Sequence, residues 1–355
     1  MNKNKKVYIG VSIMQAQPIA VVNADETGAP KTCFQGGIER LRLSSQCWKR
    51  AMRSYMKEYF GDDSVRSHTL KEYLVRYLQE KEGVDAKEAL TLVSDFMKTA
   101  GIISSKDDKK DTSTFFNMRQ IDRMCEKIRS LYKEGRSAKD ISDEEKQEIV
   151  ADLNSTPSAA QLFFGRMFAS NPDLDYDSCC AVAHAVSVNR YEKVFDLFTN
   201  KADSDLGSGS KGAAFLDTRI LGAGLLYRYA SLDLSETSSI VKESSIDEAE
   251  AAAQFVEAFA MSFPAGGRHA YAPGTVPERI VVEIRTDRPI NYNPAFDEAI
   301  SGENIKEKAY EAFDSYRAKI CGMYGSPAVT LDTKDSLSLS DICTKVKEFV
   351  ENNRS

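Results

Sequence analysis

The residues best suited to bind a ligand lie together in the segment 31–57, KTCFQGGIERLRLSSQCWKRAMRSYMK. Its only acidic residue is Glu39. Because the whole chain has 47 basic residues in 355, an average segment of this length would hold between three and four. This one holds seven: Lys31, Arg40, Arg42, Lys49, Arg50, Arg53 and Lys57. Ammonium and guanidinium groups at this density are suited to bind anions, phosphate groups in particular.

The second half of this segment has the spacing of an amphipathic helix, expected to begin at Ser44 or Ser45 and to run to about Phe60. With a rotation of about 100° per residue, the apolar side chains gather on one face. They are Trp48, Met52, Tyr55, Met56 and Tyr59. The opposite face carries Gln46, Lys49, Arg50, Arg53 and Lys57. We therefore expect the apolar face to be buried and the basic face to be exposed.

The start of this helix adds further groups that bind anions. The hydroxyls of Ser44 and Ser45 lie beside the free N–H groups of the first helical turn, and Arg40 and Arg42 come just before them on a predicted strand. Together these groups are suited to follow a phosphate backbone without reading bases. The alternative is a basic stripe that only forms the solvated face of a helix.

The other reactive residues form no recognisable catalytic or metal-binding motif. His68, His184 and His269 are far apart in the sequence, and His184, in a run rich in alanine and valine, is expected in a helix as a core histidine. The seven cysteines include no C-x-x-C pair, which argues against a zinc site and favours reduced, mostly buried thiols. No nucleophile elbow and no Walker loop occurs. We expect no catalytic residue, no metal and no cofactor.

The bulk composition is that of a globular protein, with 42% hydrophobic and 28% charged residues. The net charge of −6 argues mildly against nucleic-acid binding. Whether the chain can bind nucleic acid therefore depends on the local positive charge of segment 31–57. The N-terminus has no signal-peptide pattern, and no run of about 18 apolar residues predicts a transmembrane helix. We therefore expect a cytoplasmic location.

The first half of the chain begins with a strand, because Val7, Ile9, Val11 and Ile13 recur at period two. A long loop over 17–37, a strand over 38–43 and the basic helix follow. Residues 62–165 are predicted to form an inserted helical subdomain. Its apolar stripe comprises Leu70, Tyr73, Leu74, Tyr77 and Leu78.

In the second half, a helix is expected over 176–198, followed by a glycine- and serine-rich linker or hairpin over 200–213. The remaining elements are predicted strands over 223–234 and 279–285 and predicted helices over 248–261, 307–320 and 339–350. This order favours an α+β fold, with an RRM-like core split by insertions.

Several motifs resemble the CasC family, which forms the backbone subunit of the type I-E CRISPR Cascade complex. The N-terminal signature, NADETGAPKTCFQGGIERLRLSSQCWKRAMR, covers residues 23–53. FFGRMFAS (163–170) is similar to the family's G-R-M segment. AVAHAVSVNRYEKVFDLFT (181–199) resembles the approach to the family's thumb, and AAFLDTRILGAGLLYRYASLDL (213–234) resembles the thumb's return.

The resemblance implies a hand-like α+β fold with an RRM-like (ferredoxin-like) palm, a helical fingers insertion and a thumb hairpin. By position, residues 1–61 would form the first part of the palm and 62–165 the fingers. Residues 166–199 would form a palm helix region, 200–222 the thumb hairpin and 223–355 the second part of the palm.

The resemblance also implies a function: non-catalytic binding of CRISPR RNA in an antiviral ribonucleoprotein. Copies of the chain would line up along the RNA with other Cascade subunits, and each thumb would displace one nucleotide. The guide would then pair in segments with a target DNA strand.

The same resemblance assigns RNA contacts by position. Basic and polar residues near the helix would contact the RNA: Lys31, Arg40, Arg42, Ser44, Gln46, Lys49, Arg50 and Arg53. Arg166 and Met167 lie in the matching G-R-M segment, where Met167 would be an apolar wedge at the kink. Phe198, Thr199 and Leu216 would surround the displaced base, and Arg268 would contact RNA from the loop after Gly266 and Gly267. For Met167 and Phe198, packing in the core is the alternative.

Two other functions remain open at this point. Asp25, in a loop rich in glycine and proline, would assist metal-dependent cleavage of target RNA by analogy with type III complexes, or would only form an Asx turn. Alternatively, the chain is a stand-alone nucleic-acid-binding regulator whose basic helix enters a major groove.

Overall fold

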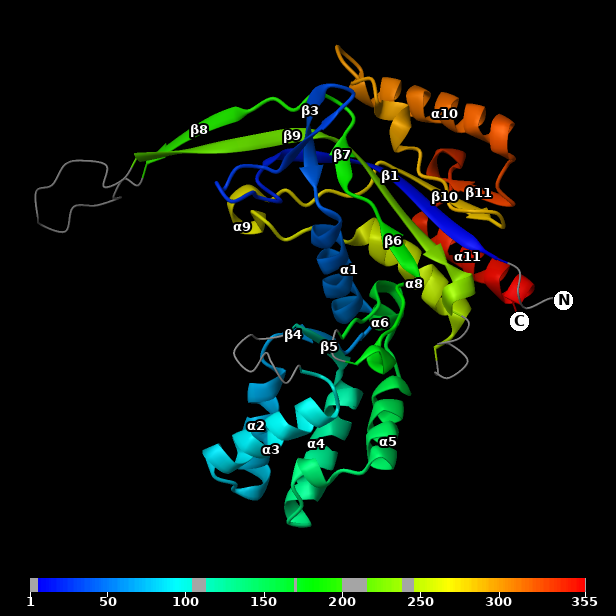
Figure 1. The fold of residues 1–355 in the computed structure, drawn as a ribbon. Coiled ribbons are helices and arrows are strands. Elements are labelled where there is room, and N and C mark those ends of the chain that lie inside the picture. The colour runs from blue at the N-terminus through cyan, green and yellow to red at the C-terminus, as the bar shows by residue number, and fades with distance from the viewer. Residues whose placement is uncertain (1–5, 104–112, 169–170, 200–215, 238–245, 355) are drawn as a thin grey trace, which may run out of the picture. The chain divides into compact units, whose positions relative to one another are not determined.

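The computed structural model describes residues 6–103, 113–168, 171–199, 216–237 and 246–354 (Figure 1). The fold is α+β, as predicted, and divides into two compact units. Unit 1 comprises Met1–Tyr55, Ala181–Ser231 and Val256–Phe349, and unit 2 comprises Met56–Cys180, Leu232–Phe255 and Val350–Ser355. Across the described ranges, no helix is both long enough and apolar enough to cross a membrane.

Unit 1 is built on a large sheet whose strands follow the order β11-β10-β1-β9-β7-β3-β2, with β6 and β8 also paired to β9. The bounds are β1 Tyr8–Ala20, β2 Thr32–Gln35, β3 Ile38–Leu43, β6 Cys180–Val182, β7 Ala185–Ser187, β8 Val194–Thr199, β9 Leu216–Asp233, β10 Arg279–Arg285 and β11 Val329–Asp332. The predicted first strand is confirmed but longer than expected, so the loop predicted over 17–37 shrinks to residues 21–31.

Each face of this sheet carries its own hydrophobic core, because successive side chains of a strand point to opposite faces. Tyr227 of β9 packs with Phe296 and with Phe313 of helix α10 (Ile305–Tyr324). The adjacent Leu226 instead packs with Trp48 of helix α1 (Ser45–Tyr59). Figure 1 shows α10 and α1 on the two sides of the sheet. The short α9 (Arg268–Tyr271), most of α11 (Leu339–Arg354) and the last part of α8 (Glu248–Met261) also lie in unit 1.

Unit 2 is mainly helical, and four of its helices, α2 to α5, share one apolar core. Its helices are α2 (Leu70–Glu82), α3 (Ala86–Thr99), α4 (Met118–Lys133), α5 (Asp143–Asn154), α6 (Ala159–Phe164) and the first part of α8 (Glu248–Met261). Leu70, Leu74 and Leu78 of the predicted stripe are buried, whereas Tyr73 is 38% exposed. A two-stranded sheet of β4 (Ser64–Ser67) and β5 (Thr114–Asn117) was not expected.

The predicted helix over 176–198 is wrong, because this segment contains no helix and holds the strands β6, β7 and most of β8. Its valines include Val182, Val186, Val188 and Val194, whose β-branched side chains favour strands. Pairing with β9 satisfies the backbone of β7 and β8. The predicted linker over 200–213 lies outside the described residues. The strands before and after it, β8 and β9, pair antiparallel from Val194 opposite Leu221 to Thr199 opposite Leu216.

The β2–β3 hairpin turns at Gly36 and Gly37, which both have positive φ. A Cβ atom on Gly36 would lie 1.7 Å from the carbonyl oxygen of Asp297, whereas one on Gly37 would meet nothing within 4 Å.

We expect Gly37→Ala to lower the free energy of unfolding by about 1–2 kcal/mol through backbone strain alone. Gly36→Ala should cost clearly more, because the hairpin must also move away from Asp297. Urea unfolding of the two variants tests this difference, and equal losses would contradict it.

Candidate nucleic-acid interface

The basic helix α1 is anchored by the stacking of two buried side chains. The guanidinium of Arg228 on β9 lies 3.6 Å from the ring centroid of Trp48 and 4.6 Å from that of Phe259. It donates hydrogen bonds to Oε1 of Gln15 and to the carbonyl oxygen of Phe259. Complete burial lowers the pKa of Arg228. Sequence reasoning missed this residue, which fixes the side of α1 that faces the sheet.

The two predicted faces of α1 are largely confirmed. Trp48, Met52 and Met56 are fully buried, but Tyr59 is 63% exposed at the last residue of the helix, where the apolar stripe leaves the core. On the other face, Gln46, Arg50 and Lys57 are exposed, and Lys49 and Arg53 are partly exposed.

The first turn of α1 is more fully hydrogen-bonded than the sequence suggested. The Ser44 hydroxyl caps the helix by accepting from the Cys47 amide at 3.3 Å. Nδ1 of His184 accepts from the Ser45 amide at 2.9 Å, and Oδ1 of Asn23 accepts from the Ser44 amide at 2.9 Å. The prediction that first-turn N–H groups are free for an anion is therefore wrong for Ser45 and Cys47.

His184 is an exposed residue between β6 and β7, so its prediction as a core histidine in a helix is wrong. Its pKa lies below the ordinary value because of partial burial and the nearby Arg42 and Lys31 cations. Burial raises the pKa of the Cys47 thiol, against the opposing effect of Lys31 and Arg50. The cations that act on these two groups are Lys31, Arg42 and Arg50.

Lys31 and Arg42 are held beside α1 by the backbone of the preceding loop. The Arg42 amide donates to the Lys31 carbonyl at 2.9 Å, and the Lys31 amide donates to the Asn23 carbonyl at 2.9 Å. Nε of Arg42 donates to the Thr32 carbonyl at 3.2 Å, and both basic residues remain partly exposed. The loop therefore presents two of the predicted cations together.

Arg40 corrects the predicted set of RNA contacts, because its side chain is fully buried. NH1 donates to the carbonyl oxygens of Ser187 and Val188 at 2.9 and 2.7 Å. NH2 donates to those of Phe296 and Asp297 at 3.0 and 3.4 Å. The guanidinium thus joins β3 to two distant segments, and no phosphate reaches it in this fold.

Arg166, in unit 2, was also predicted to contact RNA, and its side chain is likewise buried. It is 4% exposed, and its guanidinium lies 4.2 Å from the ring centroid of Tyr176. Nε donates to the Leu174 carbonyl at 2.7 Å and NH2 to Oδ1 of Asn154 at 2.6 Å. The adjacent Met167 is 81% exposed, so the core-packing alternative for Met167 is wrong.

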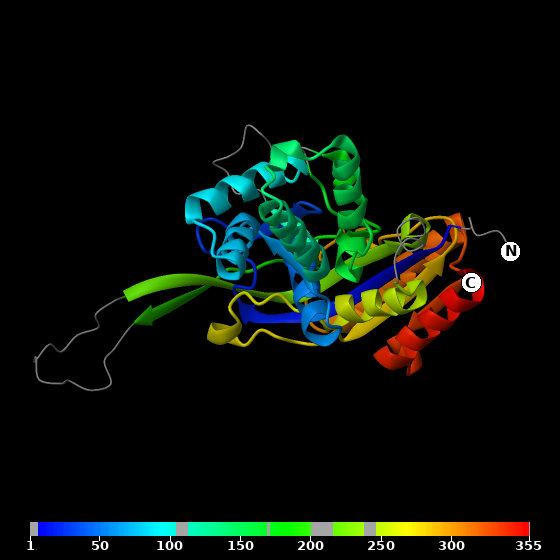
Figure 2. The ribbon, with the colours of Figure 1, turned by 90° about the horizontal axis from the view of Figure 1, so that it is seen from below.

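The register of β8 and β9 separates the side chains predicted to surround one base. Leu216 is opposite Thr199, and Phe198 is opposite Asp217. Because cross-strand partners share a face and neighbours alternate, Leu216 and Thr199 lie on one face and Phe198 on the other. Figures 1 and 2 show this hairpin extending away from the rest of the sheet.

The two faces of the β8–β9 hairpin differ in polarity. The face of Leu216 is apolar, with Phe195, Leu197 and Leu216 each between 63% and 67% exposed. On the other face, the guanidinium of Arg219 lies 4.5 Å from the ring centroid of Phe198. NH1 of Arg219 also donates to the Tyr271 hydroxyl of α9 at 3.4 Å. Arg268, at the start of α9, is exposed.

Asp25 forms the Asx turn given above as the alternative to a catalytic role. Its Oδ1 accepts from the amide and hydroxyl of Thr27 at 2.8 and 2.7 Å and from the Ala29 amide at 3.2 Å. These hydrogen bonds, led by the Thr27 hydroxyl, lower the pKa of Asp25. Among the described residues, no three His, Cys, Asp or Glu side chains come together as metal ligands.

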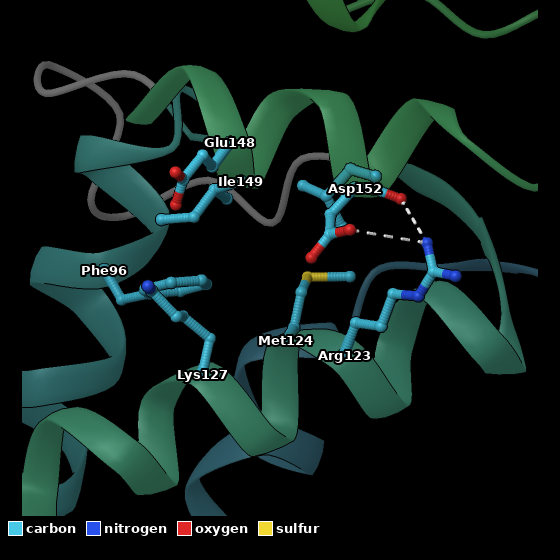
Figure 3. A pocket seen from close by; sticks show the side chains of 8 residues that line it. Phe96, Arg123, Met124, Lys127, Glu148, Ile149 and Asp152 are labelled. Carbon is cyan, nitrogen blue, oxygen red and sulfur yellow. Dashed lines mark hydrogen bonds and ion pairs between the residues drawn. The ribbon is translucent and has the colours of Figure 1, made fainter. Parts of the chain in front are cut away.

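Unit 2 contains a small pocket between α4 and α5, shown in Figure 3. Phe96, Met124, Ile149 and Leu153 supply its apolar lining. Its charged residues are Arg123 and Lys127 on α4 and Glu148 and Asp152 on α5. The Arg123 guanidinium donates to the backbone carbonyl of Asp152 at 2.8 Å and lies 3.8 Å from its carboxylate, so the charge of Arg123 is paired within the unit. The pocket is not part of the basic surface on unit 1.

Comparison with known proteins places this geometry in a family. The model of the CT1975-like protein family matches residues 9–350. A chain described as "CRISPR RNA-guided surveillance complex, pre-nicking" is 25% identical, with a TM-score of 0.82 over 97% of this chain and 99% of that chain. Another, described as "CRISPR RNA-guided surveillance complex", is 23% identical, with a TM-score of 0.71 over 97% and 99%, and shows the fold alone. A search of the curated proteins gave no match.

A structural role for Arg40 predicts a large effect on stability. Arg40→Ala should lower the free energy of unfolding by about 3 kcal/mol, because it leaves several buried carbonyl groups without their donors. Arg50→Ala, on the exposed face of α1, is the matched control and should change it by less than about 0.5 kcal/mol. Urea unfolding of both variants measures the difference. An Arg40→Ala variant as stable as the wild type would contradict the assignment.

The lowered pKa of His184 predicts a pH-dependent stability. Just below the ordinary histidine pKa of 6.5, the unfolded chain binds a proton at His184 more readily than the folded chain does, because the pKa of His184 is lowered in the folded chain. The free energy of unfolding should therefore fall as the pH drops through this window. His184→Asn keeps an acceptor for the Ser45 amide but does not titrate. Its free energy of unfolding should therefore fall less than that of the wild type as the pH drops. Urea unfolding above and below pH 6.5 measures this pH dependence, and His269→Asn on α9 is the control. Identical pH profiles for His184→Asn and the wild type would refute the prediction.

Proposed function

We propose a function for this chain, which belongs to the CT1975-like family of CasC-type Cascade backbone proteins. The chain binds a CRISPR RNA along the phosphate backbone of the RNA and catalyses no reaction. The observation that carries this proposal is the likeness, over 97% of the chain, to a chain of an RNA-guided surveillance complex. The basic surface around α1 is the part of this chain with the chemistry to support such a role.

The RNA grip is assigned to the surface that combines exposure with positive charge. It comprises Lys31, Arg42, Gln46, Lys49, Arg50 and Arg53. It leaves out Arg40 and Arg166, and also Ser44, which is 7% exposed and caps α1, so these three predicted contacts are not retained. Arg42 and Lys31 come from the loop and strand before α1, and the others lie at its start and along one face. Contacts of this type bind phosphates of any sequence, which a guide-carrying protein requires because guides differ.

The hand-like division remains part of the proposal. The sheet of unit 1 would be the RRM-like palm, residues 62–165 the fingers, and the β8–β9 hairpin the base of the thumb. Exposed Met167 has the size and polarity of a wedge that replaces lost base stacking. On the hairpin, Leu216 and Thr199 would contact a displaced base from one face, whereas Phe198 and Arg219 would meet RNA from the other. Arg268 of α9 would add a phosphate contact.

Repeated copies along one RNA are the second part of the proposal. On the apolar face of the hairpin, Phe195, Leu197 and Leu216 are exposed, and contact of these side chains with water is unfavourable. A neighbouring copy or a displaced base would cover it. The RNA between successive hairpins would remain accessible for pairing with a target DNA strand, in a complex of type I-E.

Native mass spectrometry of the chain co-expressed with a CRISPR RNA tests this proposal. We expect several copies per RNA, in a number that rises when the RNA is lengthened. A single copy on a short duplex site would instead support a stand-alone regulator and refute the proposed function. Cleavage of complementary RNA in Mg²⁺ that disappears in Asp25→Ala would overturn the non-catalytic assignment.

The grip itself predicts a salt-dependent affinity. Lys49→Ala combined with Arg53→Ala should weaken binding to single-stranded RNA and reduce the slope of log K against log salt by about 1.4, since each lost phosphate contact removes about 0.7. Titrations of labelled RNA at several salt concentrations measure this slope.

The matched control is Lys319→Ala, which removes an exposed lysine from α10. It should leave the salt slope unchanged. A double variant of Lys49 and Arg53 with the wild-type slope would rule these two residues out as phosphate contacts.

A further inference from the structure

The imidazole of His184 occupies the place at the start of α1 where an anion would reach the Ser45 amide. Its Nδ1 accepts the Ser45 N–H at 2.9 Å. A neutral imidazole carries one proton, so a ring that accepts at Nδ1 carries that proton on Nε2. The side chain is exposed, and its Nε2–H group is therefore available to a ligand from solution.

The surroundings of this N–H donor indicate the charge of that ligand. Both charged groups that shift the pKa of His184 are cations, Arg42 on β3 and Lys31 before β2. Together with the Ser45 amide of α1, they surround the ring with positive or donating groups. An anionic acceptor would balance these groups, whereas a cation would be repelled.

We propose that His184 is a further RNA contact of the α1 surface and that its Nε2–H donates a hydrogen bond to a phosphate oxygen. The ring then connects the helix to the ligand: it accepts an N–H at one nitrogen and presents an N–H at the other. The two hydrogen bonds point the same way, so each polarises the next. This contact rests on the proposed function, because it needs RNA at the start of α1.

A neutral contact of this type differs from the lysine and arginine contacts in one measurable respect. Its N–H donor carries no net charge and displaces no counterion, so it contributes affinity without contributing to the salt slope. It also differs from a helix cap, because a cap uses Nδ1 whereas the RNA contact uses Nε2.

Two substitutions separate the two nitrogens. His184→Asn places its amide near the position of Nδ1, so that Oδ1 can still accept from Ser45, but it has no donor at the Nε2 position. His184→Gln places an N–H donor near Nε2 and lacks the acceptor near Nδ1. Binding of labelled single-stranded RNA by the full chain at several salt concentrations, together with thermal unfolding, gives the two readouts.

We expect His184→Asn to weaken RNA binding about tenfold, with an unchanged salt slope and near-wild-type thermal stability. His184→Gln should keep affinity within about threefold while its unfolding temperature falls. If His184→Asn binds RNA as tightly as the wild type, the contact is refuted and His184 is only a helix cap. If the folded wild-type chain binds no RNA, the proposed function itself fails, and this contact fails with it.

Discussion

The stacking of Arg228 on Trp48 is the interaction on which the basic surface depends. A buried guanidinium without a carboxylate partner is costly, and here two hydrogen-bond acceptors and two aromatic rings offset that cost. Because Trp48 lies between the sheet and the rest of α1, the stack sets the rotation of the helix about its own axis. That rotation decides that Lys49 and Arg50, one and two residues later, are directed away from the core.

The arginines of this chain show that residue type alone does not decide function. Arg40 and Arg42 are two residues apart on β3, yet Arg40 is fully buried and Arg42 partly exposed. The difference comes from residues 187–188 and 296–297, whose carbonyl groups surround Arg40. The same guanidinium group that suits a phosphate also suits a cluster of carbonyl oxygens, and burial selects between these roles.

The local pattern of the sequence predicted those features that depend on neighbouring residues. The faces of α1 follow from its helical period, and Ser44 follows from cap chemistry. The burial of Arg40 and the exposure of His184 depend on contacts between segments more than 130 residues apart, which no local pattern contains. The faces of Phe198 and Leu216 depend on the hairpin register, which was not visible in either strand alone. The strands within 176–198 were missed because alanine and valine together also fit a helix.

The net charge of −6 is compatible with an RNA-binding role, because charges act on a bound phosphate only over short distances in salt solution. At physiological ionic strength, charges separated by more than about 8 Å in water are largely screened, so a phosphate responds chiefly to the groups it touches. Around the start of α1 these are Lys31, Arg42 and the exposed side chains of the helix, such as Arg50. The acidic remainder of the chain repels phosphates that approach elsewhere and keeps non-specific contacts weak. A protein that holds RNA in one orientation gains from this contrast between a basic surface and an acidic remainder.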